Sequence, residues 1–306
     1  MRGRIALVLI LVLLTPAPGQ ATEAVDLSES RGIVGGLVID LGLGEQDTSV
    51  SAQAEDLPRV VEVYTATWCA NCVGAEHALD EAIEGENAVV LAHHRSIGEV
   101  EDPFGTQDGD WRWEDLYGSA SQEVTGLMRA APTMVFDGCR VKVGTSPSGD
   151  SLQTDYEELL ALPMPDSGAE SSTLTWTGNN NSGTVGWGFS FAPAETTSWV
   201  HRLMVVEAVA NFPEGSNGLE DYTTVVREVV TLNGDDGSMA LELPAAWDGD
   251  DLYLVLLHEW TTVAEEADGG ILGALPGLGM LTLLPILAAL LPSRRRSEQH
   301  TSELQS

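Results

Sequence analysis

Residues 60–83 read VVEVYTATWCANCVGAEHALDEAI, and this stretch decides the expected fold. Its β-branched and apolar start, residues 60–65, predicts a buried strand, and residues 72–83 have the composition of a helix. The spacing of Cys69 and Cys72 lets both sulfurs meet within the first helical turn. Cys69 then lies at the helix start, where free amides and the helix dipole stabilise a thiolate, the reactive form of cysteine. We therefore expect Cys69 to attack and Cys72 to resolve the mixed disulfide.

Strand and helix patterns alternate on either side of this stretch as far as about residue 162. A second strand is predicted at 88–93, and helices are predicted at 120–129 and 152–162. The turn Asp137-Gly138 predicts a hairpin of strands 133–136 and 140–143. Pro132 stands directly before that hairpin. The alternation argues for an α/β layer over residues 58–165.

The order strand, WCxxC, helix, strand, helix, proline, hairpin and helix is shared by the thioredoxin family. The segments VEVYTATWCANC, VVLAHH, LYG and APTMVFDG resemble extracytoplasmic thioredoxin-like proteins that carry a β-sandwich after the redox domain. The resemblance implies a thioredoxin fold and dithiol chemistry by Cys69 and Cys72. It also implies a cis Pro132 opposite the cysteines, beside which a substrate peptide pairs with the backbone.

The same resemblance indicates the candidate site residues. The substrate-binding candidates are Trp68, Ala131, Pro132 and Thr133. The buried acid that assists proton transfer in cytoplasmic thioredoxins falls at Val63, and the neighbouring Glu62 points to the opposite face of the strand. His93 and His94 end a strand whose C-terminal edge is expected to lie toward the redox site. Glu62, His93 and His94 are therefore the candidate modulators. We expect no metal or other cofactor, because there is no second CxxC and the histidines are scattered.

Two questions about the cysteines stay open. The pair Cys69 and Cys72 can also be read as a purely structural disulfide, as exported proteins often carry. Cys139 can be a second resolving cysteine, an intermolecular partner or a buried inert thiol, and the last reading is preferred.

After a linker at 163–168, residues 169–265 carry six strand-like runs separated by turn clusters, which predict an immunoglobulin-like β-sandwich. The runs are 172–177, 184–191, 200–210, 223–232, 239–243 and 251–260. Residues 22–57 are Gly-rich and acidic and are read as a linker or as a strand added to a neighbouring sheet.

Both ends of the chain carry targeting patterns. Residues 1–21 have the charged start, short apolar run and small-residue end of a secretory signal. Residues 271–291 are uncharged and long enough to span a membrane, and the arginines at 294–296 place the tail 292–306 in the cytoplasm. Pro276-Gly277-Leu278, with the apolar run and the arginines after it, resembles archaeal PGF-type sorting signals, with leucine in place of phenylalanine. Part of the tail resembles translated adapter sequence, and it is assigned no function.

The net charge of −33 at pH 7 excludes nucleic acid as a partner and suits a saline habitat. The expected fold class is an α/β thioredoxin-like domain followed by an all-β, immunoglobulin-like sandwich and a C-terminal transmembrane helix. The expected function is that of a thiol-disulfide oxidoreductase, anchored at the cell surface, that exchanges disulfides with exported proteins and with a membrane redox partner. The alternative is a non-catalytic surface scaffold or adhesion protein whose CxxC disulfide is structural.

Overall fold

The computed structural model describes residues 21–42, 44–96, 102–193 and 197–262, all within one compact unit. The helices are α1 (Ala70–Ala82), α2 (Gln107–Thr125), α3 (Leu152–Ala161) and the 3-10 turn η1 (Ala54–Asp56). The strands are β1 (Val25–Asp26), β2 (Arg31–Asp40), β3 (Gln46–Gln53), β4 (Arg59–Thr65), β5 (Ala88–His94), β6 (Thr133–Phe136), β7 (Arg140–Val143), β8 (Ala169–Gly178), β9 (Ser182–Phe191), β10 (Thr197–Asn211), β11 (Asp221–Leu232), β12 (Asp236–Glu242) and β13 (Leu252–Thr262).

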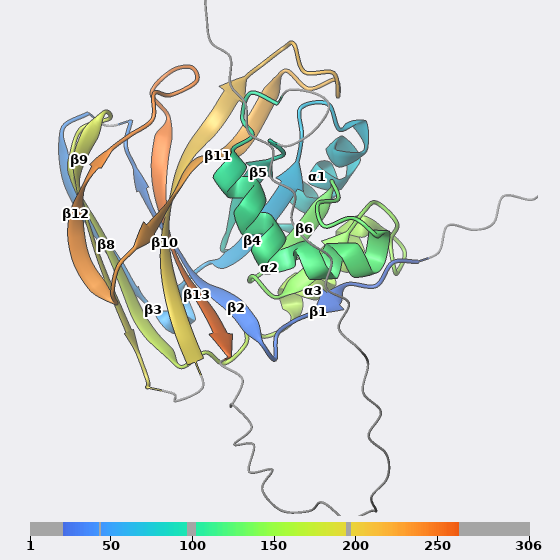
Figure 1. Cartoon of the computed structure of the whole chain (residues 1–306), viewed down its shortest axis with the longest axis horizontal. Coiled ribbons are helices and arrows are strands. Elements are labelled where there is room, and N and C mark those ends of the chain that lie inside the picture. Colours follow the sequence, from blue (N-terminus) through green and yellow to red (C-terminus); the bar gives the residue numbers. More distant parts are fainter. Residues whose placement is uncertain (1–20, 43, 97–101, 194–196, 263–306) are drawn as a thin grey trace, which may run out of the picture. The chain divides into compact units, whose positions relative to one another are not determined.

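Two sheets hold these strands (Figure 1). The larger has nine strands in the order β1-β7-β6-β4-β5-β11-β10-β13-β2, and the smaller has four in the order β12-β9-β8-β3. Strand β4 runs parallel to β5, with α1 as the crossover between them. Strand β5 in turn pairs in parallel with β11 through Ala92 and Val225. This pairing joins the cysteine-bearing segment to the C-terminal strands in one continuous sheet.

The predicted fold class, a thioredoxin-like α/β domain followed by a separate immunoglobulin-like sandwich, is wrong, and the transmembrane helix predicted after them is not found among the described residues. The described residues are mostly β-structure, and strands from before residue 57 and after residue 169 share the nine-stranded sheet with β4. The two parts are not separate because β5 is not an edge strand. Its outer edge would expose unpaired amides, and β11 pairs with it there.

The segments predicted to export the protein and to anchor it in a membrane fall outside the described residues. Residues 1–20 of the predicted signal, the predicted span 271–291 and the tail 292–306 all lie beyond them. Within the described part of the chain, every helix is too short or too polar to cross a membrane.

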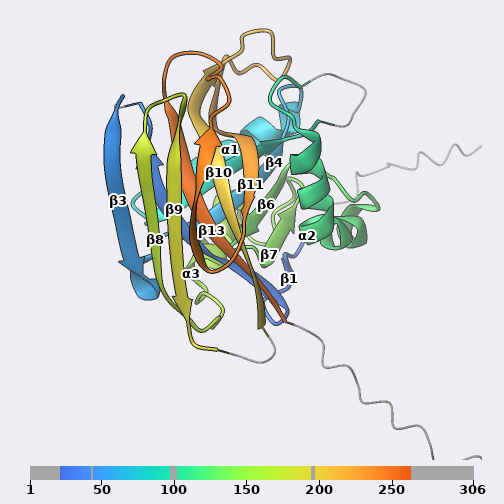
Figure 2. The same cartoon turned by 60° about the vertical axis from the view of Figure 1, so that its left-hand side comes forward.

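The sandwich core lies between the four-stranded sheet and the β10-β13-β2 end of the larger sheet (Figure 2). Leu174 and Trp176 of β8 pack there against Leu203 of β10 and Leu254 of β13. A second core lies under α1 and α3, and a third lies under α2. The larger sheet also curls, because Ile33 of the edge strand β2 packs with Val60 of β4.

The hairpin β6–β7 fixes this curl. Asp137 and Gly138 both have positive φ, 49° and 66°, as a tight two-residue hairpin turn requires. A Cβ at Gly138 would lie 2.3 Å from Ile33 Cγ1. The Ile33 amide also donates to the Asp137 carbonyl at 2.8 Å. Glycine at position 138 therefore permits the close approach of β2.

Helix α2 differs from the helix predicted at 120–129, because it begins at Gln107 and ends at Thr125. The Thr106 hydroxyl accepts a hydrogen bond from the Gly109 amide at 3.1 Å and caps the helix start. Gly126 ends the helix at a φ of 78°. The part of the helix before residue 120 thus lies in a stretch whose composition predicted no helix.

Candidate functional site

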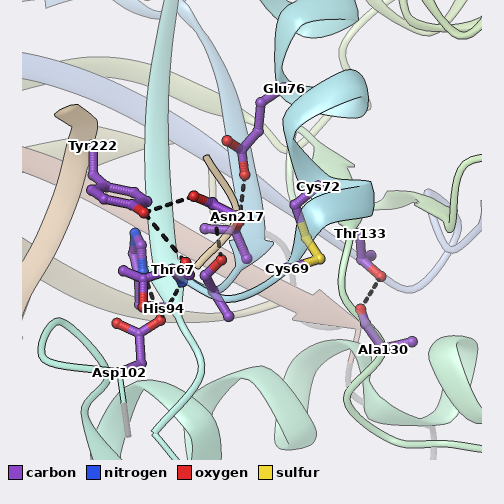
Figure 3. Close-up of a disulfide and its surroundings, with 12 residues drawn as sticks. Thr67, Cys69, Cys72, Glu76, His94, Asp102, Ala130, Thr133, Asn217 and Tyr222 are labelled. Carbon is purple, nitrogen blue, oxygen red and sulfur yellow. Dashed lines mark hydrogen bonds and ion pairs between the residues drawn. A yellow bond between two sulfur atoms is a disulfide. The ribbon is translucent and has the colours of Figure 1, made fainter. Parts of the chain in front are cut away.

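Cys69 and Cys72 form a disulfide at the start of α1 (Figure 3). Cys69 is the N-cap residue and Cys72 lies in the first turn, as the CxxC spacing predicts. The two differ in access: Cys69 is 7% exposed and Cys72 is fully buried. A disulfide is typical of proteins outside the reducing cytosol, and in this respect the chain has the character of an extracellular protein.

The turn that precedes α1 holds Cys69 in place. The Cys69 amide donates to the Ala66 carbonyl at 2.9 Å, and the Cys72 amide donates to the Cys69 carbonyl at 3.1 Å. Ala66 and the two cysteines form one small apolar cluster, against which the half-buried Trp68 packs. The guanidinium of Arg95 lies 5.6 Å from the centre of the Trp68 ring. Trp68 is therefore a wall of the disulfide site.

The segment before β6 forms the opposite wall. The Ala131–Pro132 peptide bond is cis, and Ala131 packs against the cysteine cluster. The Thr133 hydroxyl donates to the Ala130 carbonyl at 2.6 Å, and the Pro132 carbonyl accepts from the Gly144 amide at 2.8 Å. Among the described residues, the amide and carbonyl of Ala131 have no hydrogen-bond partner.

Glu62 and His93, two of the candidate modulators, lie in a separate buried network. Arg112 of α2 donates to Glu62 at 2.5 Å and to Glu259 at 2.6 Å, and His93 lies 3.0 Å from Glu62. The Tyr117 hydroxyl also donates to Glu62. Among the described residues, no hydrogen bond joins this network to the cysteines. It fastens α2 to β4 and β5 in the middle of the large sheet and to β13, next to the edge strand β2.

Charge pairing governs titration in this network. Burial by itself would raise the pKa of Glu62, but Arg112 and His93 hold that pKa well below its usual value. Burial lowers the pKa of His93, although Glu62 opposes the shift. Glu62 is therefore a structural anion at neutral pH, with no contact to a thiol.

His94, the third candidate modulator, lies behind the turn that leads to Cys69. Its Nδ1 is 3.1 Å from the Asp102 carboxylate, which accepts from the Thr67 amide at 2.7 Å. The pKa of Asp102 is lowered, because hydrogen bonds and the neighbouring His94 outweigh the effect of burial. Asn217 contacts the same turn from the β10–β11 connection, and Tyr222 contacts it from the start of β11.

Sequence reasoning missed Asp102, Asn217 and Tyr222. Asn217 stands in the cluster Glu214-Gly215-Ser216-Asn217-Gly218, which by itself signals only a turn. Tyr222 lies 155 residues beyond Thr67 in the chain. No local signal could have brought these residues to the site.

Cys139, the odd thiol, is free and fully buried. Its sulfur donates to the Phe136 carbonyl at 3.6 Å, and burial raises the thiol pKa to about 12. The preferred expectation of a buried thiol is confirmed. In the described ranges, no three His, Cys, Asp or Glu side chains are grouped so that they could hold a metal ion.

No family model and no curated protein matches the chain. Among solved structures, it is similar to a protein of Agrobacterium tumefaciens, at 17% identity and a TM-score of 0.38, over 60% of this chain and 78% of the other. It is also similar to HBP35 of Porphyromonas gingivalis, at 18% identity and a TM-score of 0.41, over 66% of this chain and 63% of the other. The chain thus spans less than two thirds of HBP35, and function must be inferred from the site.

Proposed function

We propose that the protein exchanges disulfides with exported proteins through Cys69 and Cys72. The observation that carries this proposal is the unequal access of the two sulfurs at the first turn of α1. Cys69 keeps 7% of its surface exposed and Cys72 keeps none, so in this proposal the attacking group meets Cys69 first. The helix start also favours the anionic form of a thiol at the N-cap, which makes Cys69 the better nucleophile once it is reduced.

In the oxidised form, a substrate thiolate attacks Cys69 Sγ. A substrate–Cys69 bond forms, the Cys69–Cys72 bond breaks, and Cys72 leaves as a thiolate that takes up a proton. A second substrate thiolate then attacks the substrate sulfur of the mixed disulfide and releases Cys69. The substrate dithiol is oxidised to a disulfide, and the protein pair is reduced by the same two electrons. With the reduced pair and a substrate disulfide, the same steps run in reverse.

The wall formed by Ala131 supplies the binding edge in this proposal. Its free amide and carbonyl would pair with an extended substrate segment, which places a substrate cysteine beside Cys69. Trp68 would flank that segment, whereas the fully buried Thr133 would act only through its hydrogen bond to the Ala130 carbonyl. Such pairing uses the substrate backbone and therefore accepts many sequences.

A second candidate function, a surface scaffold with a structural disulfide, is favoured by the low exposure of Cys69. The reduction potential of the pair and the pKa of Cys69 separate the two. A potential below about −300 mV with an unreactive thiol would support the scaffold. A potential in the range of exchange catalysts and a lowered thiol pKa would support exchange.

Trapping gives the sharper experiment. The full-length Cys72→Ser variant is incubated with a synthetic peptide whose single cysteine is held in a disulfide with glutathione, so that no second peptide thiol can release Cys69. We expect a stable mixed disulfide at Cys69, because the resolving sulfur is gone. The matched Cys69→Ser variant should trap nothing, and Cys139→Ser should behave as wild type. No adduct on Cys72→Ser would reject exchange.

We also propose that the protein is exported by its first 21 residues and held at the membrane by residues 271–291. The support is the pair of sequence patterns at the two ends, together with the disulfide. We propose that the redox partner of the pair is likewise a membrane protein. Cell fractionation of the full chain and of a chain that ends before residue 271 tests the anchor. Equal release of both into the medium would reject it.

A further inference from the structure

The connection between β10 and β11, residues 212–220, reaches from the sandwich strands to the turn before Cys69 (Figure 3). The Asn217 amide donates to the Thr67 carbonyl at 3.1 Å. The Tyr222 hydroxyl donates to Asn217 Oδ1 at 2.8 Å and also lies 3.3 Å from the Thr67 carbonyl oxygen. Two residues of a distant hairpin therefore converge on one peptide group beside the disulfide.

The contacts extend to the backbone of Cys69 itself. The Asn217 side-chain amide lies 3.5 Å from the Ala66 carbonyl, and that carbonyl accepts the Cys69 amide at 2.9 Å. On the far side of the turn, Asp102 accepts the Thr67 amide at 2.7 Å. Both polar groups of the Thr67 backbone are thus engaged, and the turn is held from two sides.

The side chains of Tyr222 and Asn217 are themselves held in place by their neighbours. The Tyr222 ring lies 5.7 Å from the His94 ring and 5.6 Å from the Phe104 ring, between centroids. Asn217 Oδ1 also accepts the Leu219 amide at 3.0 Å, which fixes the asparagine side chain. A Cβ at Gly215 would lie 2.0 Å from the Tyr222 hydroxyl, so glycine leaves the room that this oxygen needs.

We propose that Asn217 and Tyr222 are positioning residues that set the reactivity of Cys69. The inference rests on the proposed exchange function. The turn they hold determines where Cys69 Sγ lies relative to the amides that open α1. A thiolate gains stability there only while it stays within the first helical turn. Loosening the turn should therefore weaken that stabilisation and favour the disulfide over the dithiol.

Matched variants test this directly in the full-length protein. Tyr222→Phe removes only the hydroxyl and keeps the ring packing, and Asn217→Ala removes the side-chain amide. Asn217→Ser serves as a second variant, because it keeps a short acceptor for the Leu219 amide. Tyr253→Phe on β13 and Asn179→Ala in the β8–β9 turn are the controls, and Asn179 makes a similar local turn.

Two quantities are measured on each variant: the alkylation rate of the reduced pair against pH, and the equilibrium constant of the pair with glutathione. We expect Tyr222→Phe and Asn217→Ala to be alkylated at least threefold more slowly at pH 7. The equilibrium should shift at least threefold toward the disulfide, which corresponds to about 14 mV. The two controls should match wild type in both quantities.

Unchanged alkylation and an unchanged equilibrium in Tyr222→Phe, Asn217→Ala and Asn217→Ser would overturn the inference, even if their melting temperatures fall. This result differs from a failure of the proposed function. If the wild-type pair does not exchange with a peptide disulfide, the exchange function fails. The equilibrium with glutathione still reports, in that case, whether the hairpin sets the properties of the pair.

Discussion

The imidazole rings of His201 and His258 meet between the two sheets, with their Nδ1 atoms 2.8 Å apart. The second ring nitrogen of each is also engaged, His201 with Asp235 at 3.1 Å and His258 with Ser172 at 2.7 Å. A hydrogen bond between two Nδ1 atoms needs one of them to lack a proton. This contact therefore cannot survive protonation of both rings.

We expect the free energy of unfolding to fall as the pH drops below about 6.5. Burial, with a smaller effect of His201, lowers the pKa of His258 well below its usual value of 6.5. The unfolded chain then binds the proton first, so stability present above that pH is lost as the pH falls toward the folded pKa. The slope is about 1.4 kcal/mol per pH unit for each proton.

Urea denaturation of wild type, His258→Gln and His77→Gln over a range of pH measures this slope. His258→Gln should make the slope smaller. Part of the slope should remain, because the pKa of the buried His93 is also lowered. His77 lies exposed on α1, so His77→Gln should leave the slope unchanged. A slope that is the same in all three proteins would contradict the prediction.

The buried thiol of Cys139 should be silent in the native protein. Its raised pKa and lack of exposure leave almost no thiolate at neutral pH, so iodoacetamide should not label the native, oxidised chain. After unfolding without reductant, mass spectrometry should find label on Cys139 alone. Labelling of Cys139 before unfolding would show that the hairpin opens in solution.

Removal of Arg112 should cost more stability than removal of Arg202. Arg112→Met leaves two buried carboxylates, Glu62 and Glu259, without their shared partner, and we expect a loss of about 3–5 kcal/mol in unfolding free energy. Arg202, which meets Glu259 at 3.3 Å and is 25% exposed, provides the control. Arg202→Met should cost about 1 kcal/mol or less. If urea denaturation showed equal losses of unfolding free energy in Arg112→Met and Arg202→Met, the Arg112 network would not be what holds α2 to the sheet.

Gly215→Ala should destabilise the hairpin connection. The added Cβ would fall 2.0 Å from the Tyr222 hydroxyl, and relief requires this oxygen or the loop to move. We expect a loss of about 1–3 kcal/mol, as for other overpacked sites. At Gly188 the nearest atom to an added Cβ is 3.9 Å away, so Gly188→Ala should stay within about 1 kcal/mol of wild type. Thermal unfolding of the two variants compares them.

Local signals predicted local structure well. Strands β6 and β7 have the predicted bounds, because Asp137-Gly138 supplies the turn by its own backbone preferences. The first turns of α2 gave no such signal, since Gly109 and two tryptophans are weak helix formers. Tertiary contacts of Arg112 and Trp113 outweigh that propensity.

The site residues likewise fall into those that local sequence signals predicted and those that only the tertiary structure brings to the site. Cys69 and Cys72 were predicted from a spacing of three residues, and the cis bond at Pro132 was expected from the family resemblance. Glu62 and His93 were expected near the thiols, but the structure places them in the network under α2. Asn217 and Tyr222 reach the turn only because β11 joins β5, and no sequence pattern fixes that pairing.

Because β5 pairs with β11, the cysteine-bearing part of the chain depends on strands that follow it in the sequence. A protease cut or a shortened gene that removed everything after α3 would leave the cysteines without their support from Asn217 and Tyr222. It would also uncover a strand edge able to recruit other chains. A fragment that carried the cysteine pair alone would need some other element to cover that edge.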